Sequence, residues 1–178
     1  MFIFISGQAG SGKSRYAEER LSELSGTPKI YIACAKVYDE EMRERVRKHQ
    51  AMREGKGFIT VEKANDLADV IIPEGAGVLI ESLTIWAANE MFTAEGMREP
   101  VYVMDKICDT LSGIIARAEN TVIVADDVFS DGMKYDDMTE KYIIMLSGLH
   151  RKFAAIADEV TECFAGQCVQ YKRGRNKL

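Results

Sequence analysis

Residues 7–14 read Gly-Gln-Ala-Gly-Ser-Gly-Lys-Ser, and they follow the apolar run Phe-Ile-Phe-Ile at residues 2–5. Residues 15–24, which come next, are predicted to form a helix. The stretch therefore combines the pattern GxxxxGKS with the order of strand, loop and helix that a phosphate-binding loop requires. The sequence predicts that this part of the chain binds the phosphates of a nucleotide.

The residue types in this loop have distinct roles in phosphate binding. Glycines allow backbone N–H groups to turn inward around phosphate oxygens, and the following helix adds the positive end of its dipole. We expect Lys13 to reach the outer phosphates and Ser14 to bind a magnesium ion that bridges two of them. A chance match is the alternative, but every position of the pattern is filled in the right context. The predicted phosphate-binding residues are Gly7, Gln8, Ala9, Gly10, Ser11, Gly12, Lys13 and Ser14.

The composition limits the classes of protein to consider. With 178 residues, 47% of them hydrophobic and 29% charged, we expect one domain over residues 1–178. The net charge of −5 argues against a large nucleic-acid-binding surface. No apolar stretch is long enough to span a membrane, and the apolar start lacks a basic leader, so we expect a cytoplasmic protein.

The cysteines are predicted to be reduced thiols. They form no CxxC pattern and have no accompanying histidine, which argues against a metal site. We therefore expect neither a bound metal nor a disulfide at Cys34, Cys108, Cys163 and Cys168.

Apolar strands alternate with helical patterns along the rest of the chain. Strands are predicted at residues 29–34, 58–62, 77–81 and 121–126, helices at 39–53, 64–72, 86–92, 101–118 and 138–157, and a closing hairpin at 159–172. Residues 93–100 are predicted to form a mobile loop. This alternation predicts a three-layer α/β P-loop NTPase fold with a mostly parallel sheet, a C-terminal antiparallel hairpin, and ligands at the carboxyl ends of the strands.

Two carboxylates follow predicted buried strands. Glu81 and Asp126 each end an apolar run, the position from which a P-loop protein supplies a carboxylate to magnesium or to its water shell. Only one of them needs that role. A helix cap or a solvated strand end is the alternative for either.

His49 is the candidate nucleophile. Arg45, His49 and Arg53 are spaced i, i+4 and i+8 on a predicted helix, which places an imidazole between two guanidinium groups on one face. Such a face suits anionic phosphates, and the neighbouring cations favour the neutral imidazole that a nucleophile needs. An inert surface histidine is the alternative. His150 has no such setting and is predicted to be structural.

These motifs together resemble a known enzyme family. The chain has SGKSRYAE at residues 11–18, YIA at residues 31–33, and the pattern DxEMxxRVxxHxxxR at residues 39–53. Further matches occur at Thr60, Glu62, the strand that ends at Glu81, Asn89, residues 157–160 and the terminal hairpin. The combination resembles the bifunctional adenosylcobinamide kinase/adenosylcobinamide-phosphate guanylyltransferases of cobalamin biosynthesis.

The resemblance implies two reactions. A kinase step with ATP or GTP would phosphorylate the corrinoid adenosylcobinamide, and His49 would take GMP from GTP as a covalent phosphoramidate and pass it to the phosphorylated corrinoid. Either Glu62 or Glu81 is expected to recognise guanine, because the N1–H and N2–H₂ edge of guanine offers only donors. Magnesium is the implied metal and a homotrimer the implied assembly. Beyond the loop, the implied nucleotide contacts are Ala33, Cys34, Ala35, Gln50, Ala51, Met52, Arg53, Glu62 and Glu81.

Some positions depart from the usual pattern of that family. Gln8 and Gly10 stand where its loop usually has Gly and Arg, and residues 126–129 stand where it usually has Asn-Glu-Val-Gly. Two alternatives therefore stay open. One is a relative that retains only one activity or acts on another small alcohol, and the other is a nucleotide-binding regulatory protein without turnover.

Overall fold

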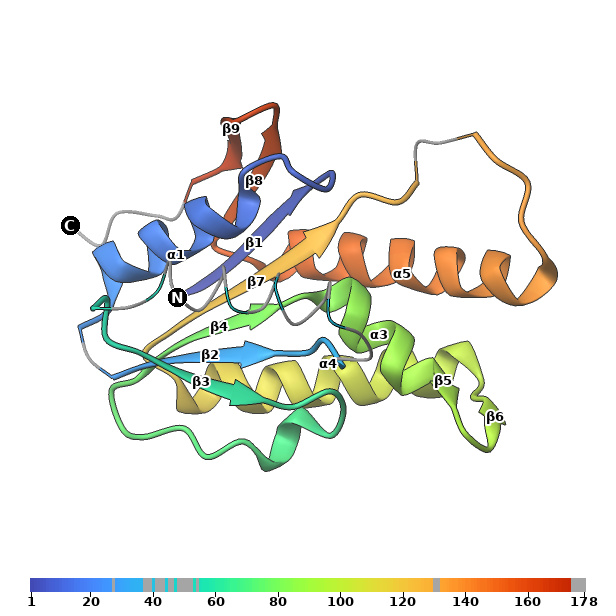
Figure 1. Ribbon diagram of the computed structural model, residues 1–178, viewed down its shortest axis with the longest axis horizontal. Coiled ribbons are helices and arrows are strands. Elements are labelled where there is room, and N and C mark those ends of the chain that lie inside the picture. Colours follow the sequence, from blue (N-terminus) through green and yellow to red (C-terminus); the bar gives the residue numbers. More distant parts are fainter. Residues whose placement is uncertain are drawn as a thin grey trace.

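A seven-stranded sheet forms the centre of the molecule (Figure 1). The computed structural model describes residues 1–26, 28–36, 40, 44, 47, 53, 55–129 and 132–173. The strand order is β3-β2-β4-β7-β1-β8-β9. The strands are β1 (Phe2–Gly7), β2 (Lys29–Ala33), β3 (Phe58–Glu62), β4 (Gly77–Glu81), β7 (Asn120–Asp126), β8 (Glu159–Phe164) and β9 (Gln167–Lys172).

All neighbouring strands of this sheet are parallel except the last pair. β8 runs parallel to β1, and β9 returns antiparallel along β8. The sequence prediction of a mostly parallel sheet with a closing antiparallel hairpin is therefore confirmed. The connections from β1 to β2, from β4 to β7 and from β7 to β8 include helices, as is usual for the long crossovers that parallel strands need.

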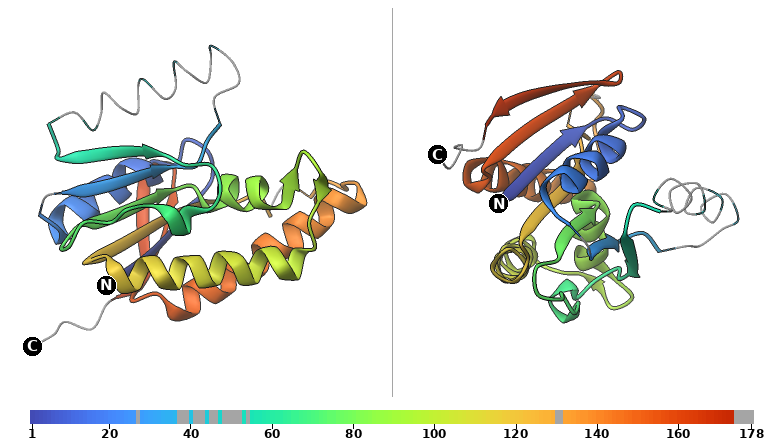
Figure 2. Two further views of the ribbon diagram at one scale, coloured as in Figure 1. Left: turned by 90° about the horizontal axis from the view of Figure 1, so that it is seen from below. Right: turned by 90° about the vertical axis from the view of Figure 1, so that its left-hand side faces the viewer.

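Helices cover both faces of the sheet (Figure 2). On one face lies α1 (Lys13–Leu24), and on the other lie α3 (Leu83–Met91), α4 (Pro100–Arg117) and α5 (Asp137–Ile156). Neighbouring strand residues point to opposite faces, so that Ile3 packs in the cluster with α1 whereas Phe4 packs in the cluster with the other three helices. This alternation explains why the central strands are apolar throughout: both of their faces are buried.

Local sequence signals set several helix starts. The Ser82 hydroxyl accepts a hydrogen bond from the backbone N–H of Ile85 and caps α3. The Asp136 carboxylate accepts from the N–H groups of Met138 and Thr139 and caps α5. Pro100 occupies the first turn of α4, where its missing N–H costs nothing.

Some predicted elements differ from the structure. The helix predicted at 64–72 is only a 3₁₀ turn, η1 (Leu67–Asp69), because Asp66 before it has a left-handed backbone conformation and Val70 after it is extended, with Leu67 and Val70 both buried in the core. The loop predicted at 93–100 contains a short hairpin of β5 (Phe92–Thr93) and β6 (Gly96–Met97). Most of the helix predicted at 39–53 lies outside the described residues.

In the part of the chain that the structure describes, none of the helices has both the length and the apolar character needed to cross a membrane.

Candidate nucleotide-binding site

The carboxyl ends of the parallel strands meet at one edge of the sheet, and the loop at residues 8–12 lies there. Strand register places Gly7 opposite Asp126, and it places Ala33 opposite Glu81. Residues from four different strands are therefore brought to the loop. Such an edge is where ligands of open parallel sheets bind.

The conformation of the loop requires glycine at particular positions. Gly12 has φ 92° and directly precedes the first residue of α1, a backbone angle that side chains other than glycine rarely adopt. Gly7 is restricted by space, because a Cβ atom there would lie 2.4 Å from the carbonyl oxygen of Cys163. The glycines of the pattern thus allow the loop to turn into α1 while it packs against β8.

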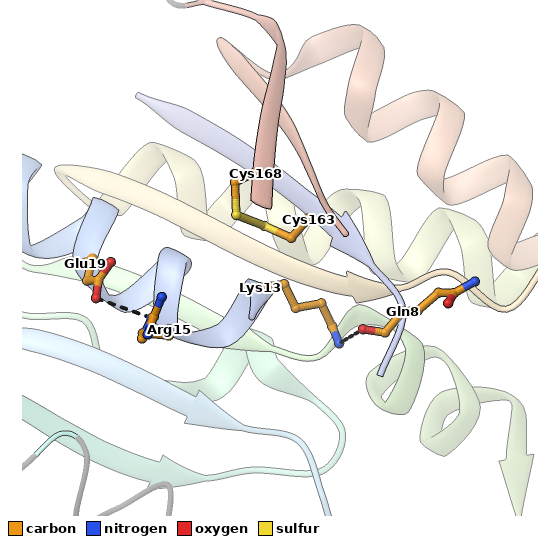
Figure 3. The surroundings of a disulfide bond; sticks show 6 residues. All are labelled: Gln8, Lys13, Arg15, Glu19, Cys163 and Cys168. Carbon is orange, nitrogen blue, oxygen red and sulfur yellow. Dashed lines mark hydrogen bonds and ion pairs between the residues drawn. A yellow bond between two sulfur atoms is a disulfide. The ribbon is translucent and has the colours of Figure 1, made fainter. Parts of the chain in front are cut away.

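Lys13 is held at the mouth of the loop. Its Nζ atom lies 2.7 Å from Oδ1 of Asp126 and donates a hydrogen bond of 3.1 Å to the backbone oxygen of Gln8. Figure 3 shows the side chain extending back toward Gln8. The ammonium group is buried, so both oxygen partners help to offset its desolvation.

Ser14 is paired with the other predicted carboxylate. Its hydroxyl donates to Oε1 of Glu81, and the hydroxyl of Tyr31 donates to Oε2 of Glu81 at 2.9 Å. Burial, followed by the nearby Glu81 carboxylate, raises the pKa of Tyr31, so this hydroxyl stays protonated and remains a donor. The two carboxylates therefore have different partners, since Glu81 contacts Ser14 and Asp126 contacts Lys13.

The donor set beside the loop fits magnesium. A hydroxyl oxygen at Ser14 and a carboxylate at Glu81 lie together, and hard oxygen ligands are those that Mg²⁺ prefers. Within the described ranges, no group of three or more His, Cys, Asp or Glu side chains could hold a metal ion. A magnesium ion here would accordingly depend on phosphate oxygens and water for its other ligands.

Arg53 is brought to the site through Tyr31. The guanidinium carbon lies 3.5 Å from the centre of the Tyr31 ring, and Nη1 lies 3.6 Å from Oε1 of Glu18. Arg53 is 5% exposed and Glu18 is 2% exposed. Arg53 thus packs against the side chain that positions Glu81. The four residues before it that were predicted as nucleophile and nucleotide contacts, His49, Gln50, Ala51 and Met52, lie outside the described residues.

The remaining predicted contacts lie at the ends of β2 and β3. Ala33 and Glu62 are directly opposite each other in the register of these strands, and the Glu62 side chain is exposed. Cys34 is buried, with its N–H bonded to the Glu81 carbonyl and its carbonyl bonded to Asn89. Ala35 follows in the same segment and is half-buried.

Sequence reasoning missed the role of Tyr31. Its hydroxyl binds Glu81 and its ring supports Arg53, so it connects two predicted site residues. The available signal was a tyrosine within an otherwise apolar buried strand, because a buried phenol needs a hydrogen-bond partner.

His150 packs among aromatic rings. Its ring centre lies 5.2 Å from that of Phe4 and 4.9 Å from that of Phe129. Burial lowers the pKa of His150 to about 4 against the opposing effect of Asp127 and Asp126. The imidazole is therefore neutral near neutral pH.

The expectation of four reduced cysteines is wrong for two of them. Cys163 and Cys168 form a disulfide across the β8–β9 hairpin, whereas Cys34 and Cys108 are free (Figure 3). The antiparallel register places the two residues directly opposite each other, with their Cα atoms 4.2 Å apart. Sequence spacing does not reveal that register. The hairpin also contacts the loop, because the N–H of Gly166 donates to the Ser11 carbonyl at 3.0 Å.

Comparison with solved structures supports the fold alone. A solved ATPase domain matches with a TM-score of 0.51 and 12% sequence identity, over 90% of this chain and 68% of that chain. The P4 protein from bacteriophage phi6, solved in complex with ADP, matches with a TM-score of 0.50 and 16% identity, over 98% of this chain and 56% of that chain.

Sequence comparison identifies the family. The family model for cobinamide kinase / cobinamide phosphate guanyltransferase matches residues 3–171. The bifunctional adenosylcobalamin biosynthesis proteins CobU of Escherichia coli (strain K12) and Salmonella typhimurium (strain LT2) are each 27% identical to this chain, over 97% of this chain and the whole of each relative. The chain therefore belongs to the cobinamide kinase / cobinamide phosphate guanyltransferase family of cobalamin biosynthesis, and it is a nucleotide-dependent transferase.

Proposed function

We propose that this protein phosphorylates adenosylcobinamide with ATP or GTP and then transfers GMP from GTP to adenosylcobinamide phosphate. The second reaction proceeds through a guanylyl-histidine at His49 and gives adenosylcobinamide-GDP. The observation that supports a phosphoryl-transfer site best is the pairing of Lys13 with Asp126 and of Ser14 with Glu81 at the loop. These are the residue types that a P-loop transferase uses on a nucleoside triphosphate.

The site residues have separate roles in this proposal. Residues 7–14 surround the phosphates with backbone N–H groups, and Lys13 moves from Asp126 and the Gln8 carbonyl to the outer phosphates. The contact between Ser14 and Glu81 supports these two residues as magnesium ligands, with Asp126 nearby. Bound magnesium supplies charge neutralisation at the phosphate oxygens.

In this proposal Glu62 recognises guanine. Glu81 is engaged by Ser14 and Tyr31, whereas the exposed Glu62 side chain lies at the end of the neighbouring strand. A carboxylate can accept from both donors on the guanine edge. Residues 33–35 and 50–53 complete the predicted nucleotide contacts.

Each step of the two reactions forms one bond to a phosphorus atom and breaks another. In the kinase step the acceptor hydroxyl oxygen forms a bond to the γ-phosphorus, the hydroxyl loses its proton, and the nucleoside diphosphate leaves. In the guanylyl step a nitrogen of His49 forms a bond to the α-phosphorus of GTP and pyrophosphate leaves. A phosphate oxygen of adenosylcobinamide phosphate then attacks the same phosphorus and frees the histidine.

Labelling with α-labelled GTP tests the guanylyl step. The wild-type protein with magnesium is expected to retain label through a P–N bond that acid cleaves and alkali spares. His49→Asn should lose both labelling and guanylyl transfer but keep kinase activity, because γ-phosphoryl transfer to an alcohol needs no covalent enzyme intermediate. His150→Asn is the control and should label normally. A wild-type protein that phosphorylates adenosylcobinamide but never becomes labelled would contradict the guanylyl-histidine.

A further inference from the structure

A cavity of about 400 Å³ lies beside the phosphate-binding loop, between that loop and α5. Gln8 and Asp127 contribute to its wall on the loop side. Tyr135, Tyr142 and Ile143, from the start of α5 and the residues before it, contribute to the opposite wall. None of these lining residues other than Gln8 belongs to the predicted nucleotide contacts.

The cavity adjoins the place where the transferred phosphoryl group is expected. The backbone oxygen of Gln8 accepts a hydrogen bond from Lys13, and the backbone N–H of Asp127 donates to the Gly7 carbonyl at 3.0 Å. In a phosphate-binding loop the lysine reaches the outer phosphates. A γ-phosphate at the loop would therefore lie next to the cavity, and an acceptor in the cavity would be close to it.

Among the described residues, the lining combines the Asp127 carboxylate with the polar side chains of Gln8 and Thr139 and with aromatic and apolar groups. Oδ1 of Asp127 accepts a hydrogen bond of 3.1 Å from the backbone N–H of Phe129, which orients the carboxylate. The hydroxyl of Tyr142 donates to the Thr84 carbonyl at 2.7 Å, so its ring is fixed in the wall. Tyr135 is 39% exposed and extends the apolar surface toward solvent.

This chemistry suits an uncharged alcohol on a bulky, largely apolar framework. The geometry points to this cavity as the subsite for the alcohol that accepts the phosphoryl group, with the hydroxyl against Asp127; the inference rests on the proposed kinase activity. The O–H bond breaks and its proton passes to the Asp127 carboxylate. The oxygen forms its bond to the γ-phosphorus as the bond to the β-phosphate oxygen breaks, and the nucleoside diphosphate leaves with that electron pair.

The Asp127 carboxylate disfavours the product. A phosphate ester carries a charge of about −1.5 to −2 near neutral pH. Once Asp127 has passed its proton to solvent, an ester held in this subsite would face the Asp127 carboxylate, and like charges in a partly dehydrated site repel. The subsite should therefore bind the alcohol more tightly than its phosphate ester, which promotes release of the product before the guanylyl step.

Filling the cavity tests its location. Ile143→Trp introduces an indole into the cavity, whereas Ile144→Trp is the matched control on the same helix, at a side chain that is 69% exposed and does not line the cavity. We expect Ile143→Trp to weaken binding of adenosylcobinamide at least about tenfold, corresponding to ~1.4 kcal/mol, without changing GTP binding. Equilibrium dialysis measures adenosylcobinamide binding without requiring turnover.

The outcomes separate the subsite from the proposed function. Equal binding of adenosylcobinamide by Ile143→Trp and Ile144→Trp would overturn the subsite while leaving the proposed function intact. Binding by the wild-type protein without phosphorylation would overturn the proposed kinase, and with it the transfer role given to Asp127. Absence of any binding by the wild-type protein would overturn both.

Removing the carboxylate charge tests Asp127. Asp127→Asn should lower kcat of the kinase about 100-fold, the scale of a lost general base, while the KM for adenosylcobinamide changes much less. Labelling by α-labelled GTP should be unaffected. Glu140→Gln, an exposed acid in the first turn of α5, is the control and should match the wild type. An unchanged kcat in Asp127→Asn would contradict the assignment of the hydroxyl proton to this carboxylate.

Discussion

The phosphate-binding loop and the surroundings of Glu90 both bring a lysine to a carboxylate, but they satisfy these charges differently. Glu90 is 1% exposed, and its carboxylate accepts from the N–H of Asp66, from Trp86, from Arg98 and from Lys106, with Lys106 Nζ at 2.7 Å. We refer to these residues as the Glu90 cluster. The cluster connects α3 and α4 to the segments between them and to the start of η1.

Within the described residues, Lys13 at the phosphate-binding loop has fewer partners than Glu90 has in its cluster. Lys13 contacts only two oxygen groups in the described part of the chain, Asp126 and the Gln8 carbonyl. Phosphate oxygens can replace both partners, because they offer the same kind of acceptor with more charge. A buried carboxylate surrounded by donors stabilises the fold, whereas a lysine with replaceable partners is available for a ligand. The following predictions test that difference.

The largest effect is expected from Lys13→Ala. Loss of the ammonium group should reduce both proposed activities at least about 1,000-fold, because one set of phosphate contacts serves both reactions. Steady-state assays of phosphorylation and guanylyl transfer, together with GTP titration, measure this. Near-normal GTP binding and turnover by the variant would contradict the assignment of the loop.

Glu90→Ala should have the opposite profile. Removal of the carboxylate leaves the cations of Arg98 and Lys106 without their buried partner, and we expect the free energy of unfolding to fall by about 3 kcal/mol. Turnover per folded molecule should stay near that of the wild type. Urea denaturation measures the loss, and Glu95→Ala, at an exposed acid, serves as the matched control. A stable but inactive Glu90→Ala would show that the cluster belongs to the site.

Acid should lower the free energy of unfolding, because His150 is half-buried as a neutral imidazole. Its pKa is lowered from 6.5 to about 4 by burial, so the unfolded state binds more protons than the folded state between these values. Stability from the neutral imidazole is complete above about pH 6.5 and decreases as the pH falls, by about 2 kcal/mol between pH 7 and pH 5. Denaturation at a series of pH values measures this slope. His150→Leu should flatten it, and an equal slope in the variant would assign the pH dependence to other groups.

The smallest effects should distinguish the carboxylates near the nucleotide. Glu62→Gln should weaken GTP about tenfold (~1.4 kcal/mol) and leave ATP unchanged, because only guanine presents two donors to that side chain. Glu81→Gln should weaken both nucleotides alike and raise the magnesium concentration needed for binding. Titrations with each nucleotide at several magnesium concentrations measure both. A selective loss of GTP in Glu81→Gln would exchange the two roles.

Most of the fold could be predicted because its signals are local. Apolar strands that end in carboxylates, a glycine-rich loop and helical spacing identify β1, β4, β7 and α4 within a few residues. Prediction failed where a segment gains its structure from distant contacts or is too short to give a sequence pattern. The 3₁₀ turn at Leu67–Asp69 lies where Leu67 and Val70 are buried in the core, and the β5–β6 hairpin has only two residues in each strand.

The candidate site could be predicted in its residue types but not in its pairings. Glu81 and Asp126 were both candidates for magnesium, since each follows an apolar strand. Their contacts with Ser14 and Lys13 depend on which strands are neighbours, and that order, β4-β7-β1, does not follow the chain. The role of Tyr31 was missed for the same reason.

The sequence by itself determined that the chain has a phosphate-binding loop, because the eight residues of the pattern are consecutive and their function depends on backbone geometry that glycine permits locally. It also determined the family, through motifs that extend over nearly the whole chain. Only the tertiary structure decided which carboxylate faces which loop residue, because Ser14 and Glu81 are 67 residues apart and meet only through the register of the parallel sheet. The disulfide between Cys163 and Cys168 and the cavity next to Asp127 were decided in the same way, since strand register and helix packing bring side chains together at positions that their sequence spacing does not predict.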